Sequence, residues 1–157
     1  AKTDAQLAKT DAQLAKTDAQ LAKTDAQLAK TDAKLKETST ILSNIGLNLG
    51  NTAEEFFYSA FKEKPYLANV KFDFVEANIH GRNKTVQDEF DIVLYNGESI
   101  GIVEVKHKVH PNDIDTLINR KVKNFKLLFP DYKDHKIYLG IGGMSMPSEV
   151  AKIALEK

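Results

Sequence analysis

Cysteine is absent from this chain of 157 residues, so neither disulfide bridges nor cysteine-ligated metal sites are available to it. Its 22 basic and 22 acidic residues cancel, which removes bulk charge as an argument for nucleic-acid binding. No apolar run approaches the ~18 residues of a membrane helix, and no charged-then-apolar leader opens the chain. We therefore expect a soluble, cytoplasmic protein without a membrane partner.

A seven-residue repeat fills the first 35 residues: Ala-Lys-Thr-Asp-Ala-Gln-Leu occurs four times unchanged, and a fifth copy has Lys34 in place of glutamine. A strict heptad predicts a left-handed coiled coil, here with leucine at position a and threonine at d. The seam continues through Leu42 and Ile45 to Leu49, and Gly50 is the predicted helix stop. We predict a parallel homodimer through residues 1–49. Trimeric, tetrameric or antiparallel pairing and a helical linker are the alternatives.

Residues 50–157 are predicted to form a separate α/β domain, a small mixed sheet with helices against it. Apolar periodicity and breaker residues locate its elements. In chain order they are a helix at 53–62, a strand at 70–75, a loop at 80–84, strands at 86–95 and 99–109, a helix from Pro111 to Pro130, a strand at 136–141, a turn at Gly142-Gly143, and a last helix from Pro147.

The central strands are expected to form a hairpin around Asn96-Gly97, because a type I′ turn needs positive φ at both turn residues. A two-residue loop would set Tyr95 opposite Glu98 and Asp91 opposite Ile102. Side chains alternate between the two faces of a strand, so four charged residues are predicted to share one face. They are Glu89, Asp91, Glu104 and Lys106.

Asp91 and Glu104 are the chemically informative pair on that face. Two carboxylates among apolar residues repel each other unless a cation lies between them. Oxygen ligands suit Mg²⁺ or Mn²⁺, and the backbone carbonyl of Val105 could supply another oxygen. Lys106 could orient a water or stabilise charge on a phosphate, as phosphodiester hydrolysis requires. The alternative is a structural ion pair of Lys106 with Glu104 or Glu89.

Glu54 lies on the inward stripe of the helix at 53–62, which also carries Phe57, Tyr58 and Phe61. It could point toward the carboxylates of the sheet. Alternatively, it only complements the helix dipole in the first turn.

Asp91, twelve intervening residues and then Glu104-Val105-Lys106, spread over a hairpin downstream of Glu54, resemble the PD-(D/E)xK nuclease superfamily, in its branch with Holliday-junction resolvases. The resemblance covers Gly50 to about Met146 and implies a restriction-endonuclease-like fold. It implies that Asp91 and Glu104 bind the divalent metal and that Lys106 is the catalytic lysine. Glu54 would complete the site. The strand register, independently of the resemblance, makes Glu89 a candidate for contacting these site residues without binding the metal itself.

The chain departs from the superfamily pattern at two places. Phe90 stands where the name-giving proline would precede Asp91, and the helix residue that often joins the site has only Asn119, Arg120 and Lys123 as candidates. Basic side chains downstream of the hairpin are either a solvated face or weak DNA contacts. These are Lys108, Arg120, Lys121, Lys123 and Lys126.

These features predict a divalent-metal-dependent DNA endonuclease that acts as a coiled-coil homodimer. Its metal would activate a water for attack on the scissile phosphate. The alternative is a coiled-coil assembly protein whose nuclease-like domain binds nucleic acid or protein without cutting. A purely structural repeat protein is a third possibility.

Overall fold

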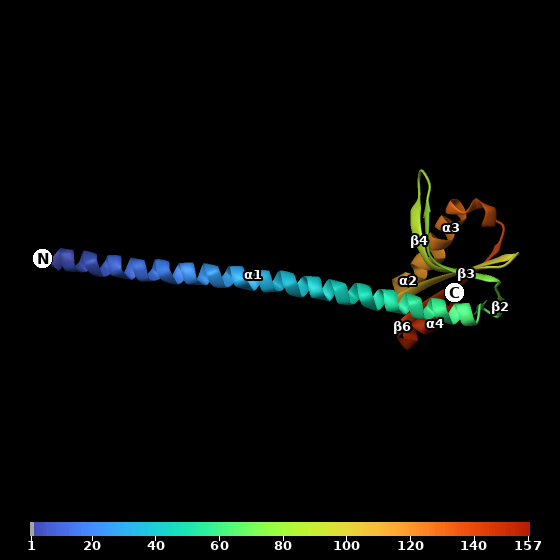
Figure 1. The fold of residues 1–157 in the computed structure, drawn as a ribbon, viewed down its shortest axis with the longest axis horizontal. Helices are drawn as coiled ribbons and strands as arrows, with labels where there is room; N and C mark the ends of the chain where they lie inside the picture. The colour runs from blue at the N-terminus through green and yellow to red at the C-terminus, as the bar shows by residue number, and fades with distance from the viewer. Residues whose placement is uncertain (1) are drawn as a thin grey trace. The chain divides into compact units, whose positions relative to one another are not determined.

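The computed structural model describes residues 2–157, and these fall into two compact units that divide between Gly46 and Leu47. The first unit is helical throughout and belongs to helix α1, Lys2–Glu63 (Figure 1). Its described side chains are all exposed, including Leu7, Leu14 and Leu28 at 57–58% of their area. The threonine hydroxyls at position d donate to backbone carbonyls four residues back, so they are already satisfied within the helix.

The predicted helix stop at Gly50 is wrong, since α1 continues to Glu63. A stop there would use the left-handed conformation, yet no glycine between residues 2 and 157 has a positive φ. The Thr52 hydroxyl donates to the carbonyl of Asn48 at 2.8 Å, four residues back within the same helix. The helix predicted over residues 53–62 is the final part of α1, and it ends just before Pro65.

The second unit contains a four-stranded mixed sheet in the order β3-β4-β5-β6, which confirms the α/β class. The β3-β4 and β4-β5 pairs are antiparallel, and β6 joins β5 in parallel. A short hairpin, β1 Tyr66–Leu67 with β2 Val70–Lys71, forms a separate two-stranded sheet. The strands of the sheet are β3 Phe74–Arg82, β4 Gln87–Tyr95, β5 Ser99–Lys108 and β6 Lys136–Ser145.

The helix predicted between Pro111 and Pro130 is present, but its middle is a π-helical turn. It comprises α2 Pro111–Thr116, η1 Leu117–Lys121 and α3 Val122–Leu128. A short 3₁₀ helix, η2 Pro130–Tyr132, follows. The last predicted helix is α4, Ser148–Glu156.

Two strand predictions need correction. β3 begins at Phe74 and runs to Arg82, so residues 80–82 are strand rather than loop. Gly142 and Gly143 are not a turn but lie inside β6. Both glycines allow close approach: a Cβ at Gly142 would meet the Phe57 ring at 3.0 Å, and one at Gly143 would meet Val109 Cγ2 at 2.5 Å.

The sheet separates two apolar clusters. One contains Ala53 with alternate residues of β4 and β5, and Phe57, Tyr58 and Phe61 of α1 pack against it. The other contains Leu117 and Phe125 together with Val93, Ile100 and Ile102. None of the helices within residues 2–157 has the length and hydropathy to span a membrane.

Candidate active site

The β4–β5 turn is built on Asn96 in a way that the sequence did not predict. Its Oδ1 accepts the backbone N–H groups of Glu98 at 3.0 Å and Ser99 at 2.7 Å. The type I′ turn is wrong, because neither Asn96 nor Gly97 has a positive φ. Tyr95 therefore lies opposite Ile100 instead of Glu98.

This register differs from the predicted one by two residues, and a shift of two leaves the side chains of Ile92–Tyr95 on their predicted faces. The ladder runs from Tyr95 to Ile92, which pairs with Val103. Continued by one residue, it sets Asp91 opposite Glu104 instead of Ile102. The two acids are close enough for the Asp91 carboxylate to repel that of Glu104.

At Asp91, the alternation of side chains between the two faces of β4 shifts by one residue. Phe90 and Val93 belong to the cluster beside α3, whereas Ile92 belongs to the cluster beside α1. Asn78, opposite Asp91 in the β3–β4 register, has a φ of 54°, a left-handed conformation that asparagine tolerates. Asp91 Oδ2 accepts the backbone N–H of Val105 at 2.7 Å. Its carboxylate therefore replaces a ladder partner between β4 and β5.

Glu104 is buried, with 4% of its area exposed. Burial raises the pKa of this carboxyl, and repulsion from Asp91 raises it further, while the Lys121 and Lys106 ammonium groups oppose both effects. Glu104 Oε1 lies 3.1 Å from Lys121 Nζ but lacks hydrogen-bond geometry to any partner within residues 2–157. This buried oxygen therefore retains acceptor capacity.

Lys121 is the main site residue that sequence reasoning misplaced. It was predicted as a weak DNA contact or part of a solvated face, but only 6% of its area is exposed. Its Nζ lies 3.1 Å from Asp88 Oδ1 and donates to the carbonyl of Glu89. Lys121 ends the π turn, and the inserted residue in such a turn rotates the following side chains relative to an α-helix. Heptad-type counting along the helix could not have found this rotation.

Asp88 is the second carboxylate that pairs with the ammonium group of Lys121. Burial raises its pKa, but hydrogen bonds from Asn124, the backbone of Glu89 and Lys121 outweigh burial and hold the pKa below its usual value. The Asn124 amide donates to Asp88 Oδ2 at 2.6 Å. Neither Asp88 nor Asn124 was predicted, because each acquires its role only through the contact between β4 and α3.

Lys106 lies beside Glu104 and remains accessible. Its Nζ is 3.8 Å from Glu104 Oε2, and 41% of its side chain is exposed. The two residues line a cavity of about 260 Å³ together with Asp113, Thr116, Arg120 and Lys121. A predicted acid and the predicted catalytic lysine thus share one small, polar cavity with a buried cation.

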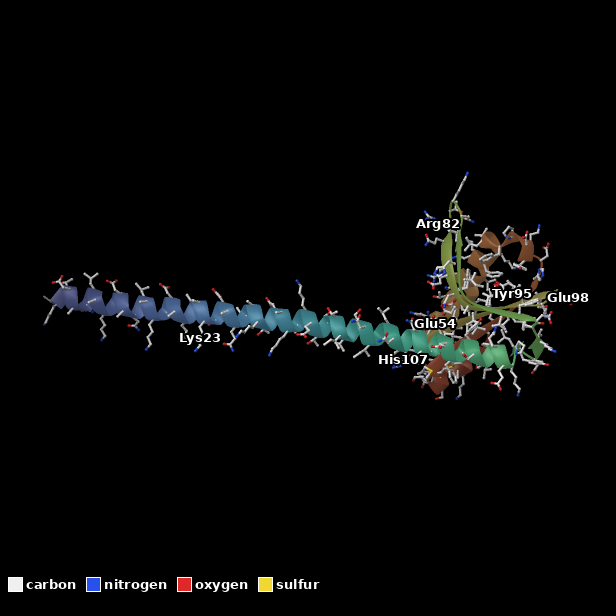
Figure 2. The ribbon with its side chains drawn as sticks, in the orientation of Figure 1. Lys23, Glu54, Arg82, Tyr95, Glu98 and His107 are labelled. Atoms are coloured by element: carbon white, nitrogen blue, oxygen red, sulfur yellow. The ribbon has the colours of Figure 1, made fainter. Side chains whose placement is uncertain are left out.

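Glu54 and Glu89 lie in the electrostatic field of the same site. Burial raises the pKa of Glu54, Asp91 and Glu89 raise it further, and Lys106 lowers it. Glu54 is half-buried on α1 (Figure 2). The Glu89 carboxylate is exposed and lies 3.3 Å from His80 Nε2. Only the backbone carbonyl of Glu89 contacts Lys121, so its side chain does not join the Glu104 cluster.

Two carboxylates, those of Asp91 and Glu104, are the main candidate side-chain ligands for a divalent metal. Within residues 2–157, no group of three or more His, Asp or Glu side chains is arranged to hold a metal ion. Mg²⁺ binds through one or two carboxylates and keeps several waters, so a pair of carboxylates such as Asp91 and Glu104 fits its usual ligand count. The acceptor capacity left on Glu104 Oε1 agrees with this fit.

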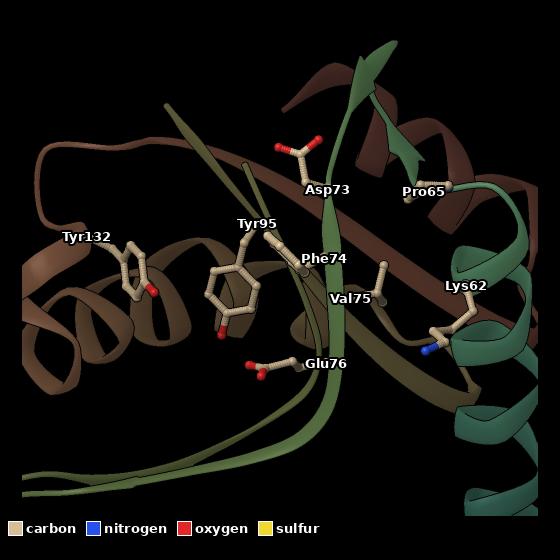
Figure 3. Close-up of a pocket in the computed structure, with 8 residues that line it drawn as sticks. All are labelled: Lys62, Pro65, Asp73, Phe74, Val75, Glu76, Tyr95 and Tyr132. Carbon is tan, nitrogen blue, oxygen red and sulfur yellow. The ribbon is translucent and has the colours of Figure 1, made fainter. Parts of the chain in front are cut away.

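A larger cavity of about 470 Å³ lies elsewhere on the domain and contains none of the predicted site residues (Figure 3). Burial and the neighbouring Glu76 raise the pKa of Tyr95 above its usual value. Its phenol is therefore protonated at neutral pH and hydrogen-bonds to Glu76, which makes it unsuited as a nucleophile or base. The Glu104–Lys106 cavity is the better candidate for chemistry.

The chain matches no known family model, and no curated protein compared with it shows significant similarity. The resemblance to PD-(D/E)xK nucleases consequently remains a prediction from the residues themselves.

Proposed function

We propose that residues 50–157 hydrolyse phosphodiester bonds in DNA as a divalent-metal-dependent endonuclease of PD-(D/E)xK type. The observation that supports this most directly is Glu104, a buried carboxylate that pairs with Lys121 and lies next to Asp91 and to the accessible ammonium of Lys106. A purely structural pair of Glu104 with Lys106 would not require the further, buried cation Lys121 and a cavity at the same carboxylate.

Asp91 and Glu104 would hold Mg²⁺ or Mn²⁺, with the carbonyl of Val105 and Glu54 as further oxygen donors. When bound, such an ion supplies Lewis-acid activation of water and of the phosphate. The residues of the chain have separate tasks. Lys106, at the cavity wall, stabilises negative charge on the phosphate. Lys121 pairs with the Glu104 carboxylate, so that the orientation of this carboxylate is set before substrate binds.

Residues 1–49 would pair two such domains as a parallel coiled-coil homodimer. The exposed leucine stripe supports this, because it remains in water unless another helix covers it. Two active sites in one dimer could act on both strands of a duplex or a junction. The repeat would contribute association and reach but no chemistry.

A plasmid and branched-DNA cleavage assay with Mg²⁺ or Mn²⁺ tests the nuclease. Asp91→Asn, Glu104→Gln and Lys106→Met should each lower the cleavage rate by about 10²–10³-fold or more, since each removes a group that acts on the transition state. The matched controls Asp134→Asn and Lys133→Met change the same residue types at exposed positions and should cleave normally.

Equal cleavage by all five variants, or cleavage that persists in EDTA, would rule out this mechanism. DNA or protein binding without any cleavage would instead favour the second candidate, a non-cutting coiled-coil assembly protein. The unmatched exposed leucines favour that candidate as much as they favour a dimeric enzyme.

A further inference from the structure

The outer half of the β3–β4 hairpin forms an arm beyond the rest of the sheet. β3 and β4 pair over their whole length, from Phe74 with Tyr95 to Arg82 with Gln87. β5 pairs only with Ile92–Tyr95 of β4. Residues 79–90 therefore form a two-stranded ribbon, which Figure 1 shows extending past the other strands.

Helix α3 supports this arm along one side. A Cβ at Gly81 would lie 2.8 Å from Leu128 Cδ1, so the strand approaches the helix as closely as a glycine allows. At the tip, the Asn83 amide donates to the carbonyl of Leu127 at 3.3 Å. Phe90 packs edge-on against Phe125 with ring centroids 5.2 Å apart. The arm is thus held in place from its base to its tip.

Positive charge is concentrated on the arm tip and on the supporting helix, although the whole chain is neutral. Residues 79–87 and 116–130 contain no Asp or Glu. Five exposed cations from these two segments form what we call the basic track: Arg82, Lys84, Arg120, Lys123 and Lys126.

The basic track connects the candidate active site with the arm tip. Arg120 lines the cavity that also contains Glu104 and Lys106. Lys126 precedes Leu127, whose carbonyl receives the hydrogen bond from Asn83 at the tip. Lys123 lies between these positions on α3. Arg120 therefore marks the end of the track at the cavity, and Lys126 lies next to the residue that holds the arm tip.

Among the track cations, only Arg120 pairs with an acid at the base of the arm. Asp88 is bound by Lys121 and Asn124, with the guanidinium of Arg120 more distant at 3.8 Å. Glu89 lies against His80. Within residues 2–157, no carboxylate lies within ion-pair distance of Arg82, Lys84, Lys123 or Lys126.

We propose that the basic track binds the phosphate backbone of a nucleic-acid duplex and holds one strand over the Glu104–Lys106 cavity. This inference rests on the proposed nuclease function for its substrate. Phosphate contacts fix the position and orientation of a duplex but carry no sequence information. Binding through the track is therefore independent of sequence and strongly dependent on salt.

The test is the salt dependence of binding to a short DNA duplex, measured by fluorescence anisotropy with the full chain and without divalent metal. Each lost phosphate contact lowers the slope of log K against log salt by about 0.9 for duplex DNA and about 0.7 for a single strand. The triple variant Arg82→Gln, Lys123→Gln and Lys126→Gln should therefore reduce the duplex slope by ~2.7. Lys64→Gln, Lys133→Gln and Lys152→Gln remove the same charge from other exposed positions and should leave the slope unchanged.

An equal reduction in both triple variants would overturn the track, because net charge alone would then explain it. The track is equally overturned if the wild-type chain does not bind duplex, or if it binds single strands more tightly with a reduction near 0.7 per charge. Track-dependent duplex binding without metal-dependent cleavage would support the track and overturn the nuclease. Metal-dependent cleavage that is unaffected in the track variant would support the nuclease and overturn the track.

Discussion

The heptad repeat and the α/β domain use their apolar residues in opposite ways. The repeat exposes more than half the area of Leu7, Leu14 and Leu28, whereas Phe90 and Phe125 of the domain have none exposed. A lone amphipathic helix obtains little stability from its own hydrogen bonds, and we expect another chain to cover its apolar face. The domain buries its apolar residues internally. Stability should therefore depend on concentration in the first region and not in the second.

The five tyrosines make this comparison measurable, because all of them lie beyond residue 57. Tyrosine fluorescence reports unfolding of the α/β domain alone. Circular dichroism at helical wavelengths is dominated by α1, which contains the repeat. The two regions can thus be followed separately in one unmodified chain.

The largest effect is expected from Leu14→Asp, Leu21→Asp and Leu28→Asp in one chain. Each substitution removes about 1.5–3 kcal/mol of apolar burial per helix and places a charge in the seam. Light scattering should show a monomer in place of the dimer, with loss of helical signal and unchanged tyrosine unfolding. Ala12→Asp, Ala19→Asp and Ala26→Asp add the same charge at position f, outside the seam, and should stay dimeric. A monomeric wild-type chain would contradict the coiled coil itself.

Lys121→Met should destabilise the α/β domain without affecting association through the repeat. Removing one partner of a buried charge pair costs about 3–5 kcal/mol, because Glu104 and Asp88 lose their shared cation. Urea unfolding followed by tyrosine fluorescence should show this loss, while light scattering stays unchanged. The exposed neighbour Lys123→Met should alter the unfolding free energy by no more than about 0.5 kcal/mol. Similar losses in both variants would mean that Lys121 is not a buried counter-ion.

The smallest effect is expected from Asp88→Asn, and it should depend on pH. The folded pKa of Asp88 is held below its usual value of 3.8, so its stabilisation is present above that pH and is lost as pH falls through the folded pKa. At pH 7 the variant should be less stable by roughly 1–3 kcal/mol, the worth of hydrogen bonds to a charged group. Below pH 3.8 the difference should shrink. A difference that stays constant from pH 7 to pH 3 would contradict this assignment.

Much of the candidate site was predictable because its residues follow one another along two adjacent strands. Alternation identified Asp91, Glu104 and Lys106 as residues of a hairpin, and the structure places Glu104 and Lys106 at one cavity. The exact register was not predictable, because Asn96 closes the turn with its side chain instead of a left-handed backbone. Regular alternation also could not predict that the side chains of β4 change faces by one residue at Asp91.

The sequence alone determined the heptad period, the α/β class and the location of most strands and helices in residues 70–157. These are local periodicities, and each is set by neighbouring residues within a few turns or strand positions. Only the tertiary structure decided that Lys121 is buried between Asp88 and Glu104, that Gly142 and Gly143 admit side chains from other segments, and that the β3–β4 arm lies on α3. Such contacts join residues far apart in the chain. They depend on which surfaces pack together, and no local period encodes that choice.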